Sequence, residues 1–235
     1  SDMEGLILHR AACTAAMSRC ALDLMRLSKE VAALQNLKPR VAILFSRAAT
    51  LRGKSYVSSR SAVYESLNFC GVPIGFITDE QIAAGGLKEY SCLILPETQY
   101  AAHEAIDGIR RFAKKGVCVF GYSPIEQDEY GKKVKKFKPS VVLEANKGEP
   151  LRDEFSKLLA ERNLGPEIEW DTPYGVEWRT VTMNGRRIIN MINLTKEPVQ
   201  VNVPSGQWTD LISGTDLVNP VLLEPDMPLL VAQKS

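Results

Sequence analysis

The sequence predicts an α/β protein: a doubly wound parallel sheet, preceded by a long helix and followed by a small antiparallel β-domain. Between residues 41 and 120, short apolar runs alternate with helical segments, which is typical of a parallel sheet covered on both faces. A stripe of apolar residues at heptad spacing comes before them. After residue 176, β-rich runs flank Asn184-Gly185, which is the strongest short signal for a β-hairpin.

The first predicted element is one long helix over residues 10–35. Its stripe has alternating spacings of four and three and consists of Cys13, Met17, Cys20, Leu24, Leu27, Val31 and Leu34. This spacing predicts a continuous apolar face. Two interpretations stay open. The face packs on the helix's own domain, or it forms an oligomer interface through Met17, Leu24, Leu27 and Val31.

Lys38-Pro39 ends this helix, and a regular alternation of strands and helices follows. Strands are predicted at residues 41–45, 74–78, 91–95 and 117–120. Helices are predicted at 58–69 and 103–115, and Asp79 is expected to cap a short helical turn. Right-handed crossovers then give a flavodoxin-like sheet with strand order 2-1-3-4. The strand at 41–45 should be central, because it has no polar face.

The periodicity fades between residues 124 and 149, a segment that holds Lys132, Lys133, Lys135, Lys136 and Lys138. Few aromatic residues lie among these lysines, so a solvated mobile loop is favoured over a nucleic-acid patch. A helix is predicted at residues 151–162. The predicted organisation is therefore an N-terminal helix (1–37), an α/β domain (38–145), a connecting helix with a linker (146–175) and a β-domain (176–235).

Composition narrows the possible functions. Of the 235 residues, 45% are hydrophobic and 24% are charged, with a net charge of +1, so nucleic acid and anionic membranes are not expected partners. No apolar run reaches the ~20 residues of a membrane helix. Five cysteines without a Cys-x-x-Cys motif indicate reduced, mostly buried thiols in a cytoplasmic protein. Ser1 and Asp2 before Met3 are interpreted as a cloning remnant.

Two partial motifs do not predict an activity. Gly53-Lys54-Ser55 lies where a phosphate-binding loop would be, but Ala48 replaces the first glycine of that motif, so nucleotide binding is disfavoured. Cys118 could mark a nucleophile at a strand-to-helix turn, but Pro124 follows where a helix would be required. We therefore expect Cys118 to be a buried strand residue.

No metal, cofactor or catalytic residue is expected. The sequence has two histidines, His9 and His103, too few for a histidine metal site and poorly suited to a Ser/His triad. Carboxylates such as Glu97, Asp171 and Glu177 are numerous, but no spacing pairs two of them as glycoside hydrolysis requires.

Several short motifs, each of low specificity, occur in a characteristic order along the chain. They are Tyr64-x-x-Leu67 before Cys70-Gly71-Val72-Pro73, Tyr90-Ser-Cys-Leu-Ile-Leu-Pro96, Ile109-Arg-Arg-Phe-Ala-Lys-Lys-Gly116 and Trp208-x-Asp210-Leu211-x-x-Gly214. In this order the chain resembles the C-terminal part of the glycoside hydrolase family 42 β-galactosidases. The resemblance implies a helix leaving a catalytic barrel, then a trimerisation domain with a class I glutamine amidotransferase-like fold that lacks its nucleophile, then a final β-domain.

The resemblance implies a non-catalytic oligomerisation and accessory region of a glycoside hydrolase that acts in carbohydrate metabolism. It implies self-association as a trimer or dimer, and contact with carbohydrate through the parent enzyme. No residue matches the family's catalytic glutamates, so we expect this chain alone to hydrolyse no glycoside. The alternative is an independent enzyme or binding protein for small molecules on the amidotransferase-like fold. A reading frame that continues upstream into a barrel would distinguish the two.

One ligand site can be expected from the topology. In open α/β sheets, ligands bind beyond the carboxyl ends of the strands where the winding reverses, here between strands one and three. The loops there offer Arg47, Arg52, Lys54, Glu97, Gln99 and Tyr100. The three cations stand where the resembled family has aromatic and acidic residues, and they suggest contact with an anion or a sugar acid. The alternative is a subunit contact or a solvated rim.

Overall fold

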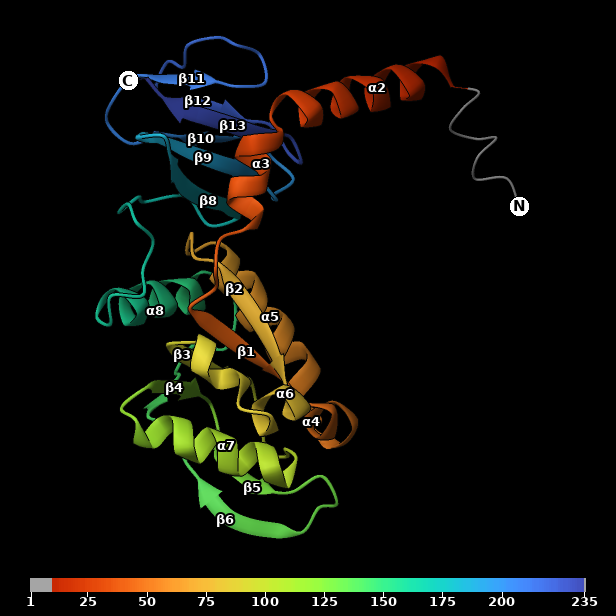
Figure 1. Ribbon diagram of the computed structural model, residues 1–235, viewed down its shortest axis with the longest axis vertical. Helices are drawn as coiled ribbons and strands as arrows, with labels where there is room; N and C mark the ends of the chain where they lie inside the picture. Colours follow the sequence, from red (N-terminus) through yellow and green to blue (C-terminus); the bar gives the residue numbers. More distant parts are fainter. Residues whose placement is uncertain (1–9, 235) are drawn as a thin grey trace.

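The computed structural model describes residues 10–234, and it confirms the predicted fold class. An α/β domain and a smaller β-domain follow each other along the long axis of the molecule (Figure 1). Helix α2 (Ala11–Arg26) projects away from the β-domain (Figure 1). Within residues 10–234, no helix combines the length and the apolar character needed to cross a membrane.

The α/β domain is built on a five-stranded parallel sheet with the order β2-β1-β3-β4-β7. Its strands are β2 (Ile74–Thr78), β1 (Val41–Phe45), β3 (Cys92–Leu95), β4 (Cys118–Gly121) and β7 (Val141–Val142). Strand β1 lies between β2 and β3, and its first four residues are buried, so its predicted central position is confirmed. The observed order extends the predicted 2-1-3-4 by one strand.

Helices cover both faces of this sheet, which makes it doubly wound. One face packs against α5 (Tyr56–Asn68) and α8 (Gly148–Ala160). The other packs against α6 (Asp79–Ala83), the 3₁₀ turn η1 (Gly86–Glu89) and α7 (His103–Lys114). Because side chains alternate along a strand, each core strand contributes apolar residues to both layers. Helix α8, which we expected to be a connector, therefore belongs to the core of the α/β domain.

Two local predictions near the carboxyl ends of the strands need correction. Thr78, not Asp79, caps α6: its hydroxyl accepts the Gln81 N–H at 3.2 Å, and the Gln81 side chain accepts the Thr78 N–H at 2.9 Å. This capping box leaves Asp79 as the first helical residue. The loop after β1 also contains a short helix, α4 (Arg47–Arg52), which begins where the Ser46 hydroxyl accepts the Ala49 N–H at 3.2 Å.

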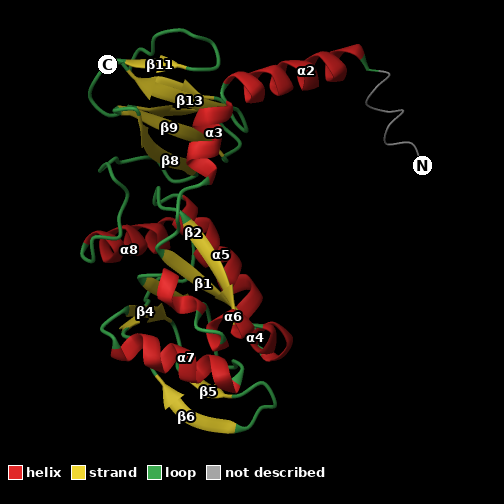
Figure 2. Ribbon diagram, in the orientation of Figure 1, coloured by secondary structure: helices red, strands yellow, loops and turns green. Residues whose placement is uncertain are grey.

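The lysine-rich segment forms an ordered hairpin, not the loop we expected. Strands β5 (Ile125–Gln127) and β6 (Lys133–Phe137) pair antiparallel, and Figure 2 shows them beside α7. The side chains of Ile125 and Phe137 are buried in the core layer that contains α7. Asp128 closes the turn by accepting the backbone N–H groups of residues 130 and 132 at 2.9 and 2.8 Å. The strands were missed because β5 has only three residues and β6 consists mainly of exposed lysines, so neither shows a clear apolar pattern.

The predicted single N-terminal helix is broken at Leu27. Helix α2 (Ala11–Arg26) ends there, and α3 (Ser28–Gln35) begins, with φ −101° and ψ 17° at Leu27. Leu27 is buried against Ile188 and Leu230 of the β-domain, and Val31 and Leu34 of the stripe pack on the same cluster. The stripe therefore packs on its own chain through α3 only, whereas α2 has no buried residue.

The β-domain consists of two small antiparallel sheets. The larger has the order β11-β13-β9-β8, with β8 (Val176–Met183) and β9 (Arg186–Asn193) joined at Asn184-Gly185. Positive φ values of 53° and 75° at these two residues confirm the predicted hairpin turn. The remaining strands are β11 (Trp208–Asp210) and β13 (Pro228–Gln233) of this sheet, and β10 (Val199–Val201) and β12 (Val221–Leu223) of the smaller one.

Candidate functional site

The carboxyl edge of the sheet is organised around the end of β1. Ser46, which is fully buried, donates its N–H to the Tyr56 hydroxyl at 2.8 Å. That hydroxyl in turn donates to the Leu44 carbonyl at 2.6 Å. Burial raises the pKa of Tyr56, so the phenol stays protonated and can donate. These bonds fix the start of α5 to the end of β1.

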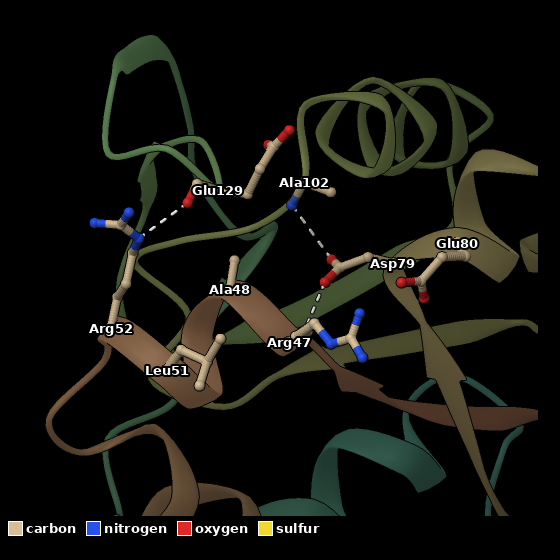
Figure 3. Close-up of a pocket in the computed structure, with 8 residues that line it drawn as sticks. All are labelled: Arg47, Ala48, Leu51, Arg52, Asp79, Glu80, Ala102 and Glu129. Carbon is tan, nitrogen blue, oxygen red and sulfur yellow. Dashed lines mark hydrogen bonds between the residues drawn. The ribbon is translucent and has the colours of Figure 1, made fainter.

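Asp79 connects the loops that follow three strands. Its carboxylate accepts the Arg47 N–H at 3.1 Å and the Ala102 N–H at 3.5 Å, as Figure 3 shows. The residue is only 3% exposed. Burial raises the pKa of its carboxyl group, and hydrogen bonds from Ser46 and the two amides oppose that shift. Because both oxygens face backbone donors, we assign Asp79 a structural role at this edge.

The larger cavity at this edge, of about 540 Å³, lies beside α4. It is lined by Arg47, Ala48, Leu51, Arg52, Asp79, Glu80, Ala102 and Glu129 (Figure 3). The Glu129 side chain accepts the His103 N–H at 2.8 Å, at the start of α7. The Glu129 carbonyl accepts from the Arg52 Nε at 2.9 Å. The hairpin turn therefore forms one wall and holds Arg52 in place.

A second cavity, of about 360 Å³, adjoins the first through Arg52. Its lining is more polar than apolar and consists of Arg52, Gly53, Lys54, Ser55, Glu97, Gln99 and Tyr100. The close approach of the chain explains Gly53: a Cβ atom there would lie 2.7 Å from the Ala49 carbonyl oxygen. Gly53 therefore serves the packing of α4 against α5, which needs no phosphate ligand.

Five of the six predicted site residues line this second cavity, and Arg47 lines only the first. Sequence reasoning missed Glu129 as a wall of the site and Asp79 as its central link. The signal for Asp79 was its place directly after β2, where it was interpreted only as a helix cap. Glu129 had no signal, because its hairpin was interpreted as a loop.

Other residues singled out in the sequence lie away from this edge. Cys118 is half-buried at the start of β4, the end opposite to the cavities, and its sulfur accepts from the Arg162 Nε at 2.9 Å. Asp171 lies in the linker before β8, and Glu177 lies on β8. Within the described part of the chain, no cluster of three or more His, Cys, Asp or Glu residues could hold a metal ion.

Comparison with known proteins identifies similar folds. No protein-family model and no curated protein matches the sequence. Among solved structures, the exo-carrageenase of glycoside hydrolase family 42 from Bacteroides ovatus is similar over 90% of this chain, with a TM-score of 0.74 and 20% identity. The β-galactosidase from Rahnella sp. R3 is similar over 85%, with a TM-score of 0.65 and 13% identity. The β-galactosidase from Bacillus circulans is similar over 84% of this chain, with a TM-score of 0.61 and 12% identity.

This chain spans less than half of each of those proteins: 31% of the exo-carrageenase, 41% of the Rahnella enzyme and 42% of the Bacillus enzyme. The structural match to family 42 enzymes thus extends over most of this chain and over one region of theirs. At these identities the likeness establishes a shared fold and carries over no catalytic residue.

Proposed function

We propose that this chain is a non-catalytic accessory and self-association region of a glycoside hydrolase of the family 42 type, which acts in carbohydrate metabolism. The observation that carries the proposal is the extent of the structural match. Between 84% and 90% of this chain follows one region of two β-galactosidases and an exo-carrageenase. A match in several consecutive elements supports a common role better than the α/β fold alone would.

Helix α2 supports the self-association part of the proposal. Met17 is 57% exposed, Leu24 53% and Met25 74%, and the helix extends beyond the β-domain. Contiguous exposed apolar surface usually marks an interface. The proposed assembly is a trimer or a dimer. Leu27 and Val31, the other two candidate interface residues, pack on the β-domain of the same chain and are less available to a partner.

The second candidate function is a small-molecule binding protein on the amidotransferase-like fold, and the cavity between Arg52 and Tyr100 favours it. Amidotransferase catalysis is not supported. Cys118 lies at the amino end of β4, whereas a nucleophile on a strand-to-helix turn would follow the carboxyl end at Gly121. Binding at the carboxyl edge and membership of a larger hydrolase are compatible with each other.

A turnover assay tests the accessory role. The purified chain is incubated with chromogenic β-galactosides, and the release of the chromophore is measured. We expect no turnover above that of buffer, because the region that this chain resembles lies outside the catalytic barrel of those enzymes. Turnover that copurifies with the chain and persists after a second purification by an unrelated method would overturn the proposal. The β-galactosidase from Rahnella sp. R3 is a suitable positive control.

A further inference from the structure

We propose that the cavity between α4, the start of α5 and the β3–α7 loop binds a sugar unit that carries a carboxylate or a sulfate. This inference rests on the proposed function and adds the chemical class of a ligand. The cavity has a volume of about 360 Å³. That size falls at the lower end of the ~300–1,000 Å³ of small-molecule sites.

Two uncompensated cations line one side of this cavity. Within residues 10–234, neither Arg52 nor Lys54 forms an ion pair with a carboxylate. Arg52 uses its Nε to bind the Glu129 carbonyl at 2.9 Å, which fixes the side chain and leaves its two terminal nitrogens for another acceptor. A fixed guanidinium suits a carboxylate or sulfate, since both offer paired oxygens in matching geometry.

The first turn of α5 adds to this positive potential. It contains no acidic side chain, and the Ser55 side chain makes no capping hydrogen bond. The positive end of the helix dipole therefore lies at the cavity wall without a compensating anion from the first turn. The helix dipole thus adds to the positive potential of Arg52 and Lys54. Those two side chains remain the main support for an anionic ligand.

The side of the cavity formed by the β3–α7 loop is suited to hydroxyl groups. Glu97, Gln99 and Tyr100 line it, and they supply a carboxylate, an amide and a phenol ring. A simple anion would gain nothing from Glu97, because like charges repel. A ring with hydroxyl donors and one negative substituent would use both sides: its charge would face Arg52 and Lys54, and its hydroxyls would donate to Glu97.

The loop that carries these residues is held in place before any ligand arrives. The Gln99 carbonyl accepts the N–H groups of Glu126 and Gln127, each at 3.2 Å, so β5 fixes the loop. The Ser59 hydroxyl accepts the Glu97 N–H at 3.2 Å. The Ser123 hydroxyl donates to the Glu97 carboxylate at 3.3 Å. A preorganised wall reduces the entropy lost on binding, which favours recognition of a small ligand.

Calorimetric titration of the full chain at low ionic strength tests this inference. The probes are D-galacturonate, D-galactose 6-sulfate, neutral D-galactose and inorganic sulfate. We expect at least one of the two charged sugars to bind at millimolar concentrations or below, and about tenfold more tightly than both neutral galactose and inorganic sulfate. Lys54→Gln should weaken that binding by about tenfold, and Lys54→Arg should largely restore it.

The matched control is Lys114→Gln, which removes one exposed lysine at the end of α7, away from the cavity. It should leave binding unchanged. Equal binding of neutral galactose, equal binding of inorganic sulfate, equal losses in the two glutamine variants, or no binding of either charged sugar would each overturn the inference. Circular dichroism confirms that every variant is folded. None of these outcomes depends on turnover or self-association, so failure here leaves the accessory role standing.

Discussion

One heptad stripe runs along both α2 and α3, but its α3 half is covered by the β-domain and its α2 half is exposed. Leu27, which directly precedes α3, is 7% exposed, and Val31 and Leu34 of α3 pack on the β-domain. In α2, Met17 and Leu24 are 57% and 53% exposed. The spacing of apolar residues is the same in both halves, so the difference lies in the neighbouring surface. A stripe predicts that a helix has an apolar face, and tertiary context decides what covers it.

The largest expected effect is a difference in unfolding free energy between variants in the two halves of the stripe. Leu27→Ala should lower the free energy of unfolding by about 2–4 kcal/mol, because it removes buried methyl groups and leaves a cavity beside Ile188 and Leu230. Leu24→Ala should change it by less than about 0.5 kcal/mol under monomeric conditions. Denaturant unfolding measures both. Equal losses for the two variants would mean that α2 is covered within its own chain.

The second prediction concerns association. Replacing Met17 and Leu24 together by Glu should weaken self-association by tenfold or more, because each charge would have to be buried in the contact. Sedimentation velocity over a range of concentrations measures the change, and unfolding measurements should show little loss of stability. Ala12→Glu with Ser18→Glu, at exposed positions outside the stripe, is the matched control. A wild-type chain that is monomeric at tens of micromolar would contradict the self-association proposal.

The influence of tertiary context also explains which parts of the α/β domain were predictable. Strand β1 has four buried residues in succession, and its central position followed from that pattern alone. Strands β5, β6 and β7 have five or fewer residues with exposed side chains among them, so their periodicity is too weak to detect. They depend on tertiary contacts, such as the burial of Ile125 and Phe137 beside α7.

The part of the candidate site on the loops after β1 and β3 was predictable from the sheet topology. The part contributed by the β5–β6 hairpin was not. Parallel strands bring the loops after β1 and β3 to one edge, so Lys54 and Tyr100 could be placed near each other from the sequence. The wall formed by Glu129 depends on a hairpin that reaches this edge from residue 128 onward. The separation of Arg47 from the second cavity follows from helix α4, since Arg47 begins that helix and Arg52 ends it.

The smallest expected effect tests how α2 is attached. Arg26, the last residue of α2, donates from its guanidinium to the Leu211 carbonyl at 2.7 Å and to the Ile212 carbonyl at 3.2 Å. Arg26→Met keeps much of the apolar stem and removes these hydrogen bonds. The bonds are exposed to water, so we expect a loss of only about 0.5–1 kcal/mol in unfolding free energy.

The informative readout for Arg26→Met is local. Hydrogen exchange in α2 should accelerate, whereas exchange in α3 should stay slow, because Leu27, Val31 and Leu34 still hold that helix on the sheet. Lys29→Met, at an exposed position on α3, is the control and should change neither helix. Acceleration in both helices would show that α3 depends on the anchor at Arg26 and not on its own apolar face, which would remove the contrast between the two halves of the stripe.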